Sequence, residues 1–112
     1  MDDERIGELF EGLGAVTIRR LFGGRGLYHR GVIVAIVLRG ELMLKADAES
    51  APDFAAAGSR QWTYSGKGRQ VAMPYWSVPE AAFDDPDDMT MWARRAYEAG
   101  LRAAAREQGP AL

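Results

Sequence analysis

The stretch from position 19 to position 30, RRLFGGRGLYHR, holds the residues of this chain best suited to bind an anion. It contains four arginines, and guanidinium groups bind phosphate readily. Lysines and arginines on other predicted strands and turns could extend the patch. The candidate cations are Arg19, Arg20, Arg25, Arg30, Lys45, Lys67 and Arg69, and Tyr28, Tyr75 and Trp76 complete the candidate binding set. Ordinary pairing with the sixteen acidic residues is the simpler interpretation of these cations.

The glycines of this stretch lack the six-residue spacing of a dinucleotide-binding fingerprint. Gly23, Gly24 and Gly26 lead into a predicted strand, so no helix N-terminus faces a phosphate. We therefore prefer a bulge or tight turn to a nucleotide cradle.

Four aromatic residues on predicted strands, Trp62, Tyr64, Tyr75 and Trp76, could stack on single-stranded bases. Aromatic residues on the strands of a small domain more often belong to the core. We therefore expect these four to be core residues.

No set of residues has the spacing of a catalytic or metal site. His29 is the only histidine and cysteine is absent, so we expect a turn residue rather than part of a zinc site or a triad. The four aspartates between positions 84 and 88 lack the register of an EF-hand, and helix capping explains them better. No spacing supports an enzyme acting through Lys45, Tyr28 or Tyr75. We expect a protein that is not an enzyme and needs no cofactor.

The composition predicts one small domain over residues 1–112. A hydrophobic content of 47% can form one core, and the chain is too short for two. No apolar stretch approaches the ~20 residues of a membrane span, and the start, MDDER, is the opposite of a basic signal peptide. We expect a cytoplasmic protein of a bacterial type. A net charge of −2 predicts weak or no direct binding to DNA.

The central element is the apolar run from Val32 to Leu38, seven residues that predict a strand buried on both faces. Arg39-Gly40 predicts a two-residue hairpin turn, and residues 41–47 return as a second strand. Opposite residues of such a hairpin share one face. The predicted pairs are Leu38 with Glu41, Val37 with Leu42, Ala35 with Leu44, and Ile33 with Ala46, the last three forming the core face.

The other face of this hairpin is half apolar and half charged, so it needs partial cover. It would carry Val32, Val34, Ile36 and Leu38 beside Glu41, Met43, Lys45 and Asp47. Either the N-terminal helix or a second subunit could provide the cover, and we expect a homodimer, with pairing along a free sheet edge.

The remaining elements follow from periodicity and capping signals. We expect a helix over 3–13, a strand over 16–22, extended structure at Leu27-Tyr28 and a turn at 29–31. A short helix over 51–57 would begin with a capping box of Ser50 and Asp53 and end at Gly58. Strands around Trp62-Tyr64 and over 71–78 would flank a loop at 65–69. A short helix would follow, and then a long helix from Asp85-Pro86 to about Glu107, with Gly109-Pro110 past its end. The buried stripe of the long helix would be Met89, Trp92, Ala93, Ala96, Tyr97 and Leu101.

Two of these strands contain residues that restrict their position. Pro74 cannot donate to a ladder, so its strand is at an edge or bulged, and we favour the edge. Arg19 and Arg20 point to opposite faces of a regular strand, so one of them should be buried against a carboxylate. The whole predicts an α+β fold: an antiparallel sheet of hairpins with an N-terminal helix, a short middle helix and a long C-terminal helix.

The sequence resembles the TfoX N-terminal domain family, the regulators of competence genes. The resemblance rests on RRLFGGRGLY at 19–28, ELMLKAD at 41–47, Phe54 and Gly58 around the short helix, MPYWSVPE at 73–80, and Trp92-Ala93. Leu21 stands where methionine is more usual. Competence regulators of this family carry a further C-terminal helical domain, whereas this chain looks like a stand-alone N-terminal domain.

The resemblance implies a compact α+β domain with no known catalytic residues. It implies a regulatory or interaction domain that acts through protein partners, such as the transcription machinery or a regulator. The alternative is a nucleic-acid-binding module that uses the arginine-rich glycine loop. Arginines gathered on one exposed face would favour the alternative, and arginines paired with acids would favour the interaction domain.

Overall fold

A computed structural model describes residues 1–21 and 23–108, and it shows the expected α+β fold. Six strands form one antiparallel sheet in the order β1-β2-β3-β4-β6-β5. The strands are β1 (Thr17–Leu21), β2 (Gly24–His29), β3 (Val32–Leu38), β4 (Glu41–Lys45), β5 (Gln61–Gly66) and β6 (Arg69–Ser77). The helices are α1 (Asp3–Leu9), α2 (Ala51–Ala56), the 3-10 helix η1 (Glu80–Asp84) and α3 (Pro86–Gln108). Helix α1 is a turn shorter than expected, and the expected stop at 109–110 lies outside the described residues.

Three two-residue turns of a basic residue followed by glycine connect the hairpins. Arg30-Gly31, Arg39-Gly40 and Lys67-Gly68 all have positive φ at both positions, from 50° to 52° at the basic residue. Such turns match the twist of the strands they join. The expected loop at 65–69 is wrong, because Gly66 pairs directly with Arg69 across the third turn.

Two of three expected caps at α2 and α3 are confirmed. Oδ1 of Asp85 accepts from the backbone N–H groups of Asp87 and Asp88 at 3.1 Å, as expected for the start of α3. Gly58, with φ of 83°, follows α2 in the position expected for a left-handed cap. The Ser50 capping box is wrong, because that hydroxyl accepts from the backbone N–H of Asp47 instead.

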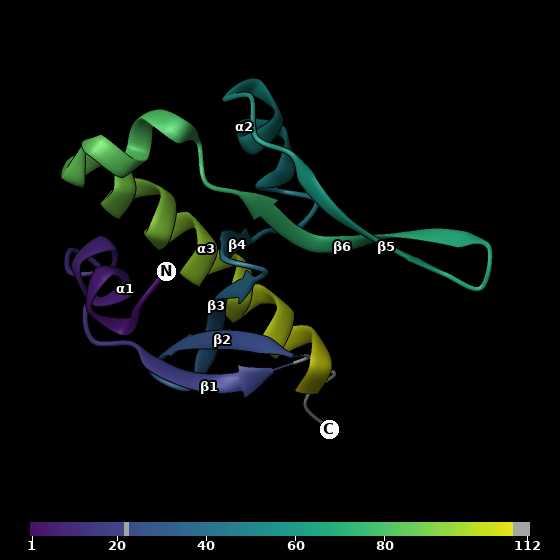
Figure 1. Cartoon of the computed structure of the whole chain (residues 1–112), viewed down its shortest axis with the longest axis horizontal. Coiled ribbons are helices and arrows are strands. Elements are labelled where there is room, and N and C mark those ends of the chain that lie inside the picture. Colours follow the sequence, from purple (N-terminus) through teal and green to yellow (C-terminus); the bar gives the residue numbers. More distant parts are fainter. Residues whose placement is uncertain (22, 109–112) are drawn as a thin grey trace.

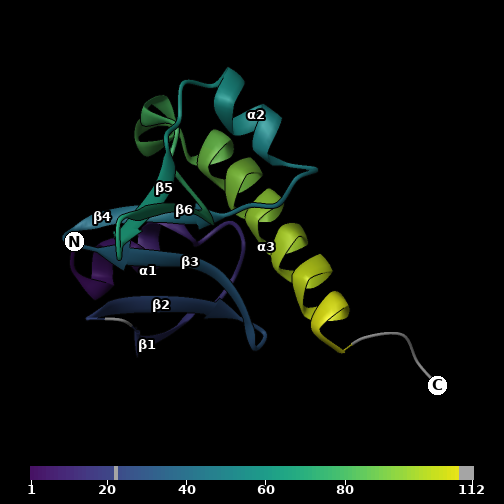
Figure 2. The same ribbon diagram turned by 90° about the vertical axis from the view of Figure 1, so that its right-hand side faces the viewer.

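All the helices pack on one face of the sheet. The main core joins Ile6 and Phe10 of α1 to Trp92 and Ala96 of α3 and to Leu44 of the sheet. Figure 1 shows α1 beside α3, and Figure 2 shows α2 beside the first half of the same helix. Helix α1 therefore does not cover the second face of the sheet. Of the two expected covers for that face, the N-terminal helix is thus wrong.

A bulge in β3 changes the faces of its first three residues, and Val32, expected on the second face, lies on the helix side against Gly100. The pairing with β2 shifts by one residue between Leu27 and Tyr28, so Ile33 lies opposite Tyr28 and Ala35 opposite Leu27. The expected pairs of Ala35, Val37 and Leu38 with β4 are confirmed. Placing Ile33 in the core and Val34 on the second face is wrong, because Val34 belongs to the main core and Ile33 to the cluster on the second face.

Strand β6 lies inside the sheet, between β4 and β5, so the expected edge position of Pro74 is wrong. The second possibility, a bulge, fits the structure. Thr63 pairs with Ala72 while Gln61 pairs with Trp76, so β6 contains extra residues around Pro74. The proline therefore lies where the ladder is interrupted, and its missing N–H leaves no regular bond unmade.

Several single-residue expectations are also wrong. Arg19 and Arg20 are both exposed, and they lie on β1, an edge strand of the sheet. His29 is a buried core residue at the end of β2, not a turn residue: its Nδ1 lies 2.8 Å from the carbonyl oxygen of Ala15 and its ring meets Tyr97 edge-on. Leu101 is exposed, because α3 approaches β3 through Gly100, where a Cβ would lie 2.6 Å from the carbonyl oxygen of Ile33.

Candidate functional site

The sheet face without helices carries a second apolar cluster, which we call the open face. Ile36, Met43 and Tyr75 are its buried centre. Around them pack Leu21, Ile33, Leu38, Trp62 and Met73, so every member of the cluster comes from a strand. An apolar sheet face that its own helices leave uncovered is a typical interaction surface.

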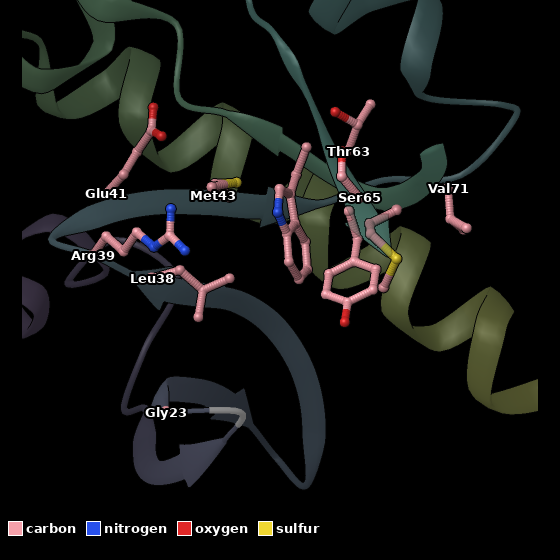
Figure 3. Close-up of a pocket in the computed structure, with 11 residues that line it drawn as sticks. Gly23, Leu38, Arg39, Glu41, Met43, Thr63, Ser65 and Val71 are labelled. Carbon is pink, nitrogen blue, oxygen red and sulfur yellow. The ribbon is translucent and has the colours of Figure 1, made fainter. Parts of the chain in front are cut away.

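A groove of about 910 Å³ crosses this face (Figure 3). One wall is the β3–β4 hairpin, with Leu38, Arg39, Glu41 and Met43, and the other is the β5–β6 hairpin. That hairpin extends from the body as an arm (Figure 1). The arm residues that line the groove are Trp62, Thr63, Tyr64, Ser65, Val71 and Met73, and Gly23 lies at the far rim.

The arm exposes apolar surface toward the groove. Tyr64 is 57% exposed and Val71 45% exposed, and these two residues pair across β5 and β6. The groove therefore combines covered apolar side chains at its floor with exposed ones on one wall. This arrangement suits apolar side chains of a partner better than a small polar ligand.

Two cations lie over tyrosine rings of the open face. The Arg19 guanidinium is 5.7 Å from the ring centroid of Tyr28, and the Lys45 ammonium is 5.0 Å from that of Tyr75. Burial raises the pKa of Tyr75 to about 12. Charge repulsion from the side chains of Tyr28 and Glu107 adds to this increase. Burial also lowers the pKa of Lys45, while the charge of Glu107 opposes this shift. The Tyr75 phenol is thus held in its protonated form, the opposite of an activated nucleophile.

The glycine stretch is a hairpin with close backbone packing. A Cβ on Gly24 would lie 2.1 Å from the carbonyl oxygen of Val37 and 2.7 Å from Cδ2 of Leu38. The stretch therefore joins β1 to β2 and lets β2 pack under Leu38. Gly23 lies in a turn, but the turn interpretation is wrong for Gly24 and Gly26, because β2 begins at Gly24 rather than at Leu27.

The structure disperses the predicted cation patch. Arg19 lies on the open face, whereas Arg25 points to the helix side and pairs with Asp3 at 2.7 Å. Arg30 lies in the β2–β3 turn. Of the predicted site residues, Arg19, Tyr28, Lys45 and Tyr75 share the open face and Gly23 borders its groove.

The four strand aromatics divide between the two faces. Trp76 stacks on Phe54 in the main core, as expected for a core residue. Trp62 and Tyr75 belong to the open-face cluster. Tyr64 is exposed, so the expectation that it is a core residue is wrong. In the residues described, no three histidine, aspartate or glutamate side chains gather as a metal site would require.

Sequence reasoning missed the main lining of the groove as a binding site. Leu38 and Met43 had been placed on the half-apolar face by strand alternation, and that signal could have identified them. Met73 and Val71 come from β6, whose position beside β4 depends on long-range pairing. Nothing local in the sequence indicates that pairing.

An antiparallel sheet with helices on one face and an open groove on the other defines the class of this protein, a two-layer α+β domain. The chain belongs to the TfoX N-terminal domain family, whose model matches residues 8–100 and thus all six strands. The search of curated proteins finds no match. Among the residues the structure describes, none of the helices has both the length and the apolar character needed to cross a bilayer.

Proposed function

We propose that this protein is a non-catalytic regulatory domain of the TfoX type, which binds protein partners through the groove of the open face. The observation that carries the proposal is the apolar lining of the groove, with Tyr64 and Val71 exposed on the arm. Partner side chains that cover this surface would gain roughly 25 cal/mol for each Å² of apolar area buried. A partner from the transcription machinery agrees with the family.

The distribution of charge indicates the chemistry of the partner. Residues 17–77, which contain all six strands, hold nine of the fourteen basic residues and four of the sixteen acidic ones. One of those acids, Glu41 at the groove, is already paired with Arg60 at 2.5 Å. A protein segment with apolar side chains flanked by acidic residues is the complementary partner.

A nucleic-acid-binding module is the second candidate. The pairs Arg19–Tyr28 and Lys45–Tyr75, which could bind phosphates and stack bases, favour it. The apolar lining of the groove and the dispersal of the arginines over both faces favour a protein partner. The same experiment separates the two.

The test is capture from native cell extract with the full chain and two matched variants. Met73→Glu places a charge in the groove, and Met91→Glu makes the same change at an exposed methionine of α3 outside it. We expect a protein that the wild type and Met91→Glu capture, that nuclease does not release, and that binds Met73→Glu at least tenfold more weakly when purified. Equal binding to both variants, or release by nuclease, would contradict the proposal, and circular dichroism checks that both variants fold.

A further inference from the structure

The sheet ends in two free edge strands of very different chemistry. Strand β1 carries the exposed Arg19 and Arg20. Strand β5, with the sequence QWTYSG, contains neither a charged residue nor a proline. Charges and prolines on an edge prevent pairing with other strands. Only β5 among these two edges lacks that protection.

The alternation of the β5–β6 ladder shows which groups of β5 are free. Gly66 and Arg69 flank a two-residue turn, so they form a hydrogen-bonded pair, and the next such pair is Tyr64 with Val71. The N–H and C=O groups of Thr63 and Ser65 therefore point to the outer edge. In the described part of the chain, no backbone bond to another element reaches these two residues from that side.

We propose that β5 pairs with β5 of a second copy of this chain, antiparallel and about a twofold axis at Thr63. The two sheets then form one continuous sheet. Thr63 lies opposite Thr63 of the second copy, and their outward backbone groups bond to each other. This inference rests on the sheet edge, which shares Tyr64 with the groove, and goes beyond the proposed partner binding.

The register is self-complementary in its side chains. Trp62 of each copy lies opposite Tyr64 of the other, on the open face, because directly opposed residues share a face. Aromatic pairs and threonine pairs are both favourable across antiparallel strands. Moving the axis to Tyr64 would place Trp62 opposite Gly66 and leave one aromatic pair, Tyr64 with Tyr64, in place of two. The exposed surface of Tyr64 is thereby covered, and each copy extends the groove wall of the other.

The charges near the axis permit this pairing. In this register Arg60 lies opposite Gly66 of the second copy, and Arg60 is already bound to Glu41. A second copy is therefore the occupant that the edge itself specifies, since residues 61–65 of β5 pair with residues 61–65 of the second copy.

The first test uses the mass in solution and charges placed at the axis. Light scattering of the wild type at micromolar concentration should give twice 12.3 kDa. Thr63→Lys and Thr63→Glu should each move the mass toward 12.3 kDa, because a residue at the axis faces its own copy. An equimolar mixture of the two variants should restore the doubled mass. Thr17→Lys, the same change at an exposed threonine of β1, should leave the dimer intact.

A wild type of 12.3 kDa would overturn the proposal. So would a dimer that survives Thr63→Lys, since that dimer would use another surface. The absence of cysteine allows a second measurement. Thr63→Cys should be joined into a dimer by a short thiol crosslinker, whereas Thr17→Cys should stay monomeric on a denaturing gel. Equal crosslinking of the two variants would also refute the pairing.

Discussion

Replacing Asp47 with asparagine should destabilise the fold through its contact with α3. Asp47 follows β4, and its side chain is only 8% exposed. Arg102 of α3 donates to it from Nε at 2.6 Å and from a terminal nitrogen at 3.1 Å, and Ser50 donates its N–H at 3.1 Å. This cluster fixes the C-terminal half of α3 to the end of the central hairpin.

The magnitude follows from the pKa of Asp47. The Arg102 guanidinium, with help from Ser50 and against the effect of burial, lowers the pKa of Asp47 from 3.8 to about 2. One pKa unit corresponds to about 1.4 kcal/mol, so the ionised carboxylate contributes roughly 2 kcal/mol to the free energy of unfolding at pH 7. For a domain of this size that is a fall of roughly 8 °C in Tm.

The pH dependence distinguishes this cause from a general loss of packing. The folded-state pKa lies below the unfolded one, so the stabilisation is present above about pH 4 and is lost as the pH falls through about 2. The gap in unfolding free energy between wild type and Asp47→Asn should be nearly complete at pH 4 and about half as large at pH 3. Urea denaturation at pH 7, 4 and 3 measures it.

Two comparisons isolate the ion pair. Asp84→Asn removes an exposed aspartate that forms no ion pair among the described residues, and it should have little effect at any of these pH values. A double-mutant cycle with Arg102→Gln should give a coupling energy of about 1 kcal/mol or more. A gap that does not change with pH, or a coupling energy below about 0.5 kcal/mol, would refute the reasoning.

Three further predictions concern single features. Gly24→Ala should lower the free energy of unfolding by about 2–4 kcal/mol, because the new Cβ would clash with the Val37 carbonyl oxygen. Gly7→Ala, whose Cβ would meet nothing within 4 Å, should raise the free energy of unfolding by up to about 1 kcal/mol by stabilising α1. Thermal denaturation of the two variants compares these effects. The difference in phenolate absorbance between wild type and Tyr75→Phe should show that Tyr75 ionises near pH 12. Because this folded-state pKa lies above the ordinary value of 10.0, the protonated phenol stabilises the fold, and that contribution to the free energy of unfolding should be lost as the pH rises from about 10 through 12. A transition near pH 10 in the folded protein would contradict that placement. Duplex DNA should bind at physiological salt no more tightly than about a micromolar, and a gel-shift midpoint below that value would favour the nucleic-acid candidate.

The sequence predicted features that depend on a few adjacent residues. Arg39-Gly40 indicated a turn because glycine accepts a positive φ, and the turn then fixed the pairing of β3 with β4. Asp85 and Pro86 indicated the start of α3 because a carboxylate can accept from free N–H groups. Each of these features is specified locally, so a single sequence is sufficient to find it.

The features that were missed depend on contacts between distant segments. The position of β6 between β4 and β5 reversed the expectation for Pro74. The bulge opposite Leu27 exchanged Ile33 and Val34, because a shift of one residue reverses the assignment of faces on the N-terminal side of the bulge. Arg20 is exposed on an edge strand, although strand alternation directed it to the helix side.

The close approach of α3 to β3 explains why one face of the sheet stays free. At Gly100 the helix lies so near the Ile33 carbonyl that a single methyl group would not fit, and α1 and α2 pack against the same helix. The apolar residues of the helices therefore pack together on one face of the sheet, and they leave the other face without a helix. The apolar residues of the open face must be covered by each other or by another molecule. Tyr64 and Val71 on the arm stay exposed, so the neighbouring residues of the chain do not cover them. The groove and the uncharged β5 edge meet at these residues, so a change at Tyr64 should affect partner binding and self-association together, while changes at Met73 and Thr63 should separate them.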